Sequence, residues 1–241
     1  MNTATKTVDR IMIVLSVVLG GGSIVLLALM GSIQFVHLGF SNPVVLLWDT
    51  ILSFLFFLQH SGMVRKAFRA RSDVILPPRF HGAIYSIASG IALIIVVVLW
   101  QKSDIQLFRL EGLTLWIARA CSAAGFLGFA WGIRALGGFD PFGLRPIRSH
   151  MRGQSDQPLP FAVRGPYRWV RHPLYSSVLI LIWASPEVTA DRLLFNVLWT
   201  AWMVVATILE EKDLVADFGD VYRDYQRMVP MLIPWRGPMQ A

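Results

Sequence analysis

Cysteine and charged residues are scarce in this chain of 241 residues. Cys121 is the single cysteine, so an internal disulfide framework is excluded. Charged residues make up 15% of the sequence, whereas a soluble domain of this size carries about 25%. A linker rich in proline, glycine and serine is also missing, so we expect one compact bundle. The composition therefore argues against a soluble protein with independent domains.

Hydrophobic residues account for 55% of the chain, and the mean hydropathy is +0.55. Apolar runs near 20 residues recur, which is about the length that crosses 30 Å of hydrocarbon. They predict an all-α polytopic integral membrane helix bundle of about five to six transmembrane helices with a C-terminal helical hairpin. The N-terminus lacks the cleavage pattern of a signal peptide, so we expect its apolar run to be retained as a span. The first four runs are residues 11–36, 44–64, 80–100 and 113–136.

The net charge of +7 would suit nucleic acid, but its distribution favours a membrane partner. Residues 65–79 carry five basic side chains against Asp73, a net charge of +4, and arginines dominate residues 134–171. Positive loops beside apolar runs face the cytoplasm in membrane proteins. We therefore expect no nucleic acid as a partner and a multi-pass location in the inner membrane. Both termini are predicted to be cytoplasmic, with residues 34–43 and 101–112 on the outside.

The predicted hairpin has unequal arms. Residues 174–185 give a first arm of about 12 residues, roughly 18 Å long and too short to cross a bilayer squarely. The second arm, near residues 191–214, is long enough. We expect residues 1–136 to form a four-helix membrane region, and residues 137–241 to form a loop, the hairpin and a tail within a single structural unit. The polar segments that flank the hairpin should then meet on the cytoplasmic face.

Two carboxylates, Glu210 and Glu211, follow the apolar second arm directly. A carboxylate left in hydrocarbon costs several kcal/mol, so each must face water, a cation or a ligand. Adjacent residues point to different faces of a helix, so the two glutamates need not act alike. One could accept both hydroxyls of a ribose, and the alternative is an ordinary interfacial helix end.

Arg171, His172 and Pro173 precede the first arm. Proline favours the start of a helix, and the N–H groups there, aided by Arg171, favour an anionic group such as a carboxylate. His172 can donate a hydrogen bond, act as a base or serve as a packing residue. Tyr222 and Tyr225 share one helix face, which suits either a pocket wall or interfacial anchoring. These residues predict a pocket for a charged, ribose-containing cofactor, but they do not name a reaction.

The same residues carry a long family pattern. It reads Gly-Pro-Tyr-x-x-x-Arg-His-Pro-x-Tyr and, after the hairpin, Glu-Glu-x-x-Leu-x-x-x-Phe-Gly-x-x-Tyr-x-x-Tyr-x-x-x-Val-Pro. Over residues 165–230 the chain resembles the isoprenylcysteine carboxyl methyltransferase and phospholipid methyltransferase superfamily. Met231 departs from it, because the family often has arginine there. The matching positions are Gly165, Pro166, Tyr167, Arg171, His172, Pro173, Tyr175, Glu210, Glu211, Leu214, Phe218, Gly219, Tyr222, Tyr225, Val229 and Pro230.

Shorter motifs elsewhere resemble the bacterial methanethiol S-methyltransferase (NnrU-like) branch, which also resembles membrane proteins linked to nitric-oxide metabolism. They are residues 57–63, the basic loop 65–71, residues 139–144, residues 184–186 and residues 189–190. The branch implies methanethiol as the acceptor and dimethyl sulfide as the product, and the superfamily implies S-adenosyl-L-methionine as the methyl donor. No metal is implied.

The resemblance also implies site residues. The enzyme would align donor and acceptor for in-line attack and exclude water. The thiol must lose its proton, because the thiolate is the nucleophile. Candidate catalytic residues for this step are His60, His172 and Glu210, and we expect His60, His81 and His172 near the cytoplasmic helix ends, where they could meet. Cofactor binding carries over to Gly165, Pro166, Tyr167, Arg171, His172, Tyr175, Glu210, Glu211 and Tyr222.

Three alternatives stay open. The acceptor of the same fold could be an isoprenylcysteine carboxylate or a lipid. A haem- or metal-binding protein would use His37, His60, His81 and His172, but no pair has H-x-x-x-H spacing and His37 falls near the opposite face. A transporter is disfavoured because its site would lie near the membrane midplane. The expected partners are a small thiol and membrane lipid, and the sequence leaves the oligomeric state open.

Overall fold

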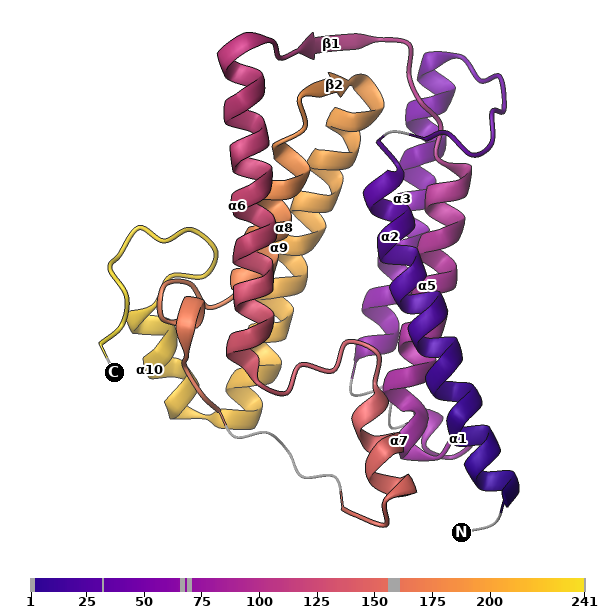
Figure 1. The fold of residues 1–241 in the computed structure, drawn as a ribbon, viewed down its shortest axis with the longest axis vertical. Helices are drawn as coiled ribbons and strands as arrows, with labels where there is room; N and C mark the ends of the chain where they lie inside the picture. Colours follow the sequence, from indigo (N-terminus) through magenta and orange to yellow (C-terminus); the bar gives the residue numbers. More distant parts are fainter. Residues whose placement is uncertain (1–2, 32, 66–67, 69–70, 156–160, 241) are drawn as a thin grey trace. The chain divides into compact units, whose positions relative to one another are not determined.

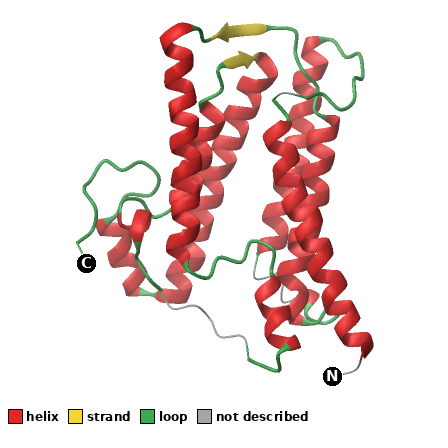
Figure 2. Ribbon diagram, viewed as in Figure 1, coloured by secondary structure: helices red, strands yellow, loops and turns green. Residues whose placement is uncertain are grey.

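The structure is a computed structural model that describes residues 3–31, 33–65, 68, 71–155 and 161–240. Helices dominate it (Figure 2). Five described helices are long and apolar enough to cross a membrane, which confirms the predicted all-α polytopic membrane fold. They are Thr5–Leu29, Asn42–Val64, Pro78–Leu99, Gly112–Leu136 and Ala190–Phe218.

The chain divides into two compact units. The first unit comprises Met1–Ser103 and Asp140–Pro158, and the second comprises Asp104–Phe139 and Leu159–Ala241. The first unit contains α1 Thr3–Leu15, the π-helix η1 Ser16–Gly21, α2 Gly22–Leu29, α3 Asn42–Val64, η2 Pro78–Phe80, α5 His81–Leu99 and α7 Leu144–Met151. The second unit contains β1 Gln106–Arg109, α6 Gly112–Leu136, η3 Gly165–Arg168, α8 Pro173–Trp183, β2 Glu187–Thr189, α9 Ala190–Phe218 and α10 Asp220–Met228.

The first span ends earlier than the sequence predicts. Its apolar run continues to Val36, but α2 ends at Leu29 and residues 33–41 have no regular secondary structure. The buried side chain of Gln101 explains the difference. Its Oε1 accepts the N–H of Leu38 at 2.9 Å, and its Nε2 donates to the carbonyl of Val36 at 3.0 Å. These side-chain bonds satisfy the backbone groups that a longer helix would have paired internally.

Helix α7 completes one end of the first unit, and the sequence analysis did not anticipate it. Figure 1 shows it beside the N-terminal half of α1. Its residue Ile147 is fully buried against Phe80 and Ala83, with Met12 and Ile13 of α1 packed around them. The apolar face of α7 therefore closes the hydrophobic core at this end of the unit.

In the second unit α6 and α8 pack lengthwise against each other (Figure 1). Glycines on α6 allow this approach. A Cβ atom at Gly128 would lie 2.9 Å from Ser177 Oγ, and one at Gly132 would lie 2.7 Å from Leu174 Cδ2. Small residues let membrane helices approach closely, so this face fixes α8 on α6.

Helices α8 and α9 form the hairpin. Helix α8 has 11 residues and α9 has 29, which matches the predicted short first arm and long second arm. Strand β2 lies between the two helices and pairs antiparallel with β1. This small sheet ties the turn of the hairpin to the segment before α6. The sheet could not be predicted from the sequence, because each strand is only three or four residues long.

Candidate functional site

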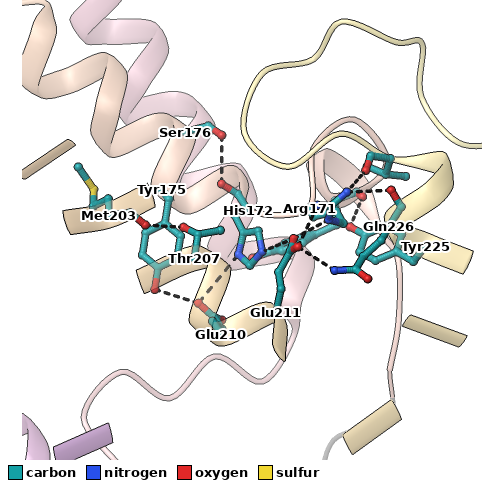
Figure 3. A network of polar contacts seen from close by, with 12 residues as sticks. Arg171, His172, Tyr175, Ser176, Met203, Thr207, Glu210, Glu211, Tyr225 and Gln226 are labelled. Atoms are coloured by element: carbon teal, nitrogen blue, oxygen red, sulfur yellow. Dashed lines mark hydrogen bonds and ion pairs between the residues drawn. The ribbon is translucent and has the colours of Figure 1, made fainter. Parts of the chain in front are cut away.

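The centre of the site is the carboxylate of Glu211, on the buried face of α9 (Figure 3). Arg171 donates to it twice, from Nε to Oε1 at 2.6 Å and from Nη2 to Oε2 at 3.0 Å. His172 Nε2 donates to Oε1 at 3.1 Å, and Gln226 Nε2 donates to Oε2 at 2.8 Å. Four donors satisfy the acceptor capacity of this carboxylate. Glu211 thereby joins the loop before α8, the end of α9 and helix α10.

Main-chain bonds hold the Arg171–His172 loop against the segment after α10. The N–H of Arg171 donates to the carbonyl of Pro230 at 2.9 Å, and that of His172 donates to the carbonyl of Met231 at 3.1 Å. Arg171 Nη1 also donates to the carbonyls of Gln226 and Val229. The contact at Met231 uses the backbone, so it does not depend on the arginine that the family often has there.

Pro173 is the first residue of α8, as the sequence predicts, and His172 is its N-cap residue. Ser176 lies one turn into the helix. Its Oγ donates to the carbonyl of His172 at 3.1 Å or to that of Leu232 at 2.7 Å. The start of α8 is therefore tied to the same C-terminal segment as the loop before it.

Glu210 differs from its neighbour. Its side chain is 46% exposed, whereas that of Glu211 is 10% exposed. Tyr175 Oη donates to Glu210 Oε2 at 3.0 Å, and the same oxygen lies 4.0 Å from His172 Nδ1. The two ring nitrogens of His172 thus face different glutamates, and in the tautomer whose Nε2 donates to Glu211, Nδ1 is an acceptor on the side of Glu210. The rings of His172 and Tyr175 stack, with centroids 5.8 Å apart.

Helix α10 supports the site through buried aromatic side chains. Tyr222, Tyr225 and Val229 form a hydrophobic cluster, against which Phe161 packs. Tyr225 Oη donates to the carbonyl of Tyr167 at 2.6 Å. Burial raises the pKa of Tyr222 and of Tyr225 above that of a free tyrosine. The predicted shared face of the two tyrosines is thus part of a packed core.

The loop Gly165, Pro166 and Tyr167 forms η3, which packs on α6. Gly165 has a left-handed φ of +54°, and a Cβ atom there would lie 3.0 Å from Trp131 Nε1. Pro166 is buried. Burial raises the pKa of Tyr167, and the negative charge of Glu210 raises it further. This loop therefore lies within electrostatic range of the exposed carboxylate.

A cavity of about 620 Å³ lies between the end of α9 and α10. Small-molecule sites typically measure about 300–1,000 Å³. Its lining combines apolar, acceptor and cationic side chains: Ile208, Glu211, Lys212, Val215, Arg223, Gln226 and Arg227.

Gln226 and Ser176 were missed by the sequence analysis. Gln226 follows Tyr225 directly in an amphipathic helix, and nothing in the sequence shows that it reaches Glu211. The predicted catalytic residue His60 belongs to the first unit, where its Nε2 lies 2.6 Å from Tyr85 Oη. His81 is also in that unit and contacts Asp73 at 3.3 Å. Within the described ranges, no three His, Cys, Asp or Glu side chains are grouped to hold a metal.

Fold and site together define a polytopic helical membrane protein with a polar network at one end of a helical hairpin. Residues 50–232 match the family model described as NnrU protein, and the chain belongs to this family. It is 37% identical over 203 residues to the methanethiol S-methyltransferase of a Pseudomonas species, covering 82% of this chain and 76% of the relative. It is 33% identical to the methanethiol S-methyltransferase of Mycobacterium tuberculosis, covering 78% and 77%. Nurim of Rattus norvegicus is 26% identical, covering 70% and 68%. No solved structure matches the chain.

Proposed function

We propose that the protein is an S-adenosyl-L-methionine-dependent methyltransferase that converts methanethiol to dimethyl sulfide. The observation that carries the proposal is the division of roles at the two glutamates. Glu211 is saturated by Arg171, His172 and Gln226, while Glu210 stays open beside His172. Relatives that share most of the chain bear the name methanethiol S-methyltransferase, which supports this substrate.

The residues present fit a charged nucleoside cofactor. Glu210 has the exposure needed to accept the ribose hydroxyls, with Tyr175 beside it. Lys212 gives the neighbouring cavity a cation suited to a carboxylate, and Arg223 and Arg227, which pair with Asp220 and Asp224, also line it. When bound, the donor would supply a methyl group on a sulfonium, which is already a good electrophile. Gly165, Pro166, Tyr167, Arg171, Glu211 and Tyr222 would support the binding surface.

The chain's own contribution is to orient the reactants and to take a proton. Methyl transfer forms a carbon–sulfur bond at the acceptor, breaks one at the donor and releases the thiol proton. His172 Nδ1 is an acceptor held in place by the bond from Nε2 to Glu211, and Glu210 lies 4.0 Å from it. We propose these two groups as the proton acceptors, which favours the thiolate. His60 is a further proposed aid.

We propose that the protein lies in the inner membrane with both termini in the cytoplasm. The support is the excess of basic residues in the loops 65–79 and 134–171. In that orientation Arg171 and the two glutamates face the compartment that holds a soluble methyl donor.

The test is a headspace assay on membranes that contain the protein, supplied with methyl-labelled S-adenosyl-L-methionine and methanethiol. We expect labelled dimethyl sulfide, with no product above background for Glu210→Gln and normal product for Arg109→Gln, an exposed residue of β1 outside the site. If the label appears instead in farnesyl-cysteine or in phospholipid, and no dimethyl sulfide forms, the proposed acceptor is wrong. Absence of label transfer to all three acceptors would contradict the methyltransferase proposal itself.

A further inference from the structure

The first unit gathers basic side chains that the proposed reaction does not use. Lys6 and Arg10 lie one turn apart on α1, and Arg148 and Arg152 lie one turn apart at the end of α7. All four are exposed. Residues four apart share one face of a helix, so each helix presents a pair of cations on one side.

A buried carboxylate fixes these two helices side by side. Asp9 of α1 is fully buried and lies 2.9 Å from His150 Nδ1 of α7 and 3.3 Å from Arg79 Nε of η2. A buried carboxylate must be compensated by such partners, so the contact sets the position of α7 along α1 (Figure 1). The two cation pairs are therefore carried on neighbouring helices of defined register.

Few acidic side chains on these two helices could neutralise the exposed basic ones. Asp9 is the sole acidic residue of α1, and α7 has none. Asp140, which precedes α7, accepts the N–H groups of Leu144 and Arg145 at 2.9 and 2.7 Å. Both carboxylates are thus engaged within the protein, and the exposed charge of the two helices is positive.

An apolar face adjoins the cations on α1. Its exposed residues continue along the same apolar helix, Thr5–Leu29, whose first two turns carry Lys6 and Arg10. Basic side chains next to an exposed apolar surface are typical of protein segments at the membrane boundary between lipid headgroups and acyl chains. The exposed apolar residues include Val8, Ile11 and Val14 of α1 and Val18 of η1.

We infer that this α1–α7 surface binds an anionic glycerophospholipid by its phosphate. Arg148 and Arg152 contact phosphate oxygens, because a guanidinium matches a phosphate with two parallel hydrogen bonds. Lys6 and Arg10 close the headgroup site from α1, and the acyl chains follow the exposed apolar face of that helix. Basic clusters at membrane boundaries favour anionic lipids over neutral ones. The bound lipid would stabilise the packing of α7 against α1.

The experiment titrates the full-length protein in neutral detergent with phosphatidylglycerol or phosphatidylcholine, and reads bound lipid by native mass spectrometry and Tm by thermal unfolding. We expect phosphatidylglycerol to be retained and to raise Tm, and phosphatidylcholine to do neither. The double variant Arg148→Gln/Arg152→Gln should bind phosphatidylglycerol about 30-fold more weakly, since each basic side chain contributes about 1 kcal/mol near an anionic surface and about 1.4 kcal/mol is tenfold.

Three matched variants make the test specific. Lys6→Gln/Arg10→Gln should also weaken the binding of phosphatidylglycerol, because it removes the cations of α1. This variant keeps the test valid if the α7 variant fails to fold. Lys102→Gln/Arg109→Gln removes the same charge elsewhere and should bind like wild type. Arg148→Lys/Arg152→Lys keeps the charge and should retain most of the affinity.

Several outcomes would overturn the inference. Equal retention of the two lipids would show that the surface does not select a negative headgroup. Wild-type affinity in both glutamine double variants would place any lipid site elsewhere. Equal stabilisation by inorganic phosphate alone would identify a soluble anion as the ligand in place of a lipid.

Discussion

Two adjacent glutamates with different surroundings decide how the candidate site is arranged. One step along a helix rotates a side chain by about 100°. This rotation turns Glu211 toward Arg171 and Gln226, and leaves Glu210 open with Tyr175 as a donor. The first glutamate is therefore suited to position the loop, and the second to meet a ligand.

This difference predicts separate effects of the two substitutions. Glu211→Gln leaves Arg171 buried without its counter-charge, so we expect a loss of about 3 kcal/mol in the free energy of unfolding. Glu210→Gln should stay within about 0.5 kcal/mol of wild type, because the position is half exposed. Thermal unfolding in detergent measures the stability, and calorimetry with S-adenosyl-L-methionine measures binding, which Glu210→Gln should abolish. Equal losses of stability in the two variants would contradict the division of roles.

The sequence predicted the members of this site better than their roles. The positions of Arg171, His172, Glu210 and Glu211 beside the hairpin arms, together with the family pattern, singled out four residues that the structure brings together. Which glutamate is saturated could not be predicted, because the answer depends on Gln226 and on carbonyls of the segment after α10. Those partners are brought together by packing between segments that are distant in sequence. Every residue has a backbone carbonyl, so the sequence does not show which carbonyls will accept a hydrogen bond.

At the scale of elements, η3 carries the loop of the site and is held on α6 by a glycine. Gly165 has a left-handed φ, and a Cβ atom added there would lie 3.0 Å from Trp131 Nε1 and 3.0 Å from Ala135 Cβ. Left-handed backbone costs roughly 1–2 kcal/mol for a residue with a side chain.

Gly165→Ala should therefore lower the stability of the second unit by about 2 kcal/mol and weaken donor binding, because the displaced η3 moves the Arg171–His172 loop. The measurements are Tm and calorimetric affinity. Gly237→Ala is the control: a Cβ atom there meets nothing within 4 Å, and both quantities should stay unchanged. A Gly165→Ala protein with wild-type affinity would show that η3 does not position the loop.

The long helices and the short hairpin arm α8 followed from apolar runs, whereas the other short elements did not. The end of the first span at Leu29 depends on the side chain of Gln101, which is 65 residues from the Val36 carbonyl that it binds. Helix α7 has eight residues and a mixed composition. The π-helix η1 lies where Gly90 of α5 approaches the backbone of Leu19. Each of these features requires a partner that sequence spacing does not reveal.

At the scale of the whole molecule, alkaline pH should destabilise the fold through tyrosines of the second unit. Burial raises the pKa of Tyr167, Tyr222 and Tyr225. The folded state then holds the phenolic protons more tightly than the unfolded chain does, so their contribution is complete below about pH 10 and is lost as the pH rises further. Unfolding measured between about pH 8 and 11 should show this decline. Tyr222→Phe should flatten it, and an unchanged slope would exclude Tyr222 as a cause.

The chain interleaves its two units, because α7 of the first unit follows α6 of the second in sequence. During synthesis, Asp9 and Arg79 emerge well before His150, and the apolar surface around Met12 waits for Ile147. The first half of α1 therefore gains its contacts with α7 only after α6 has been made. The first unit is therefore completed only after synthesis of the second unit has begun with β1 and α6. In this way the order of translation sets the order in which the two units assemble.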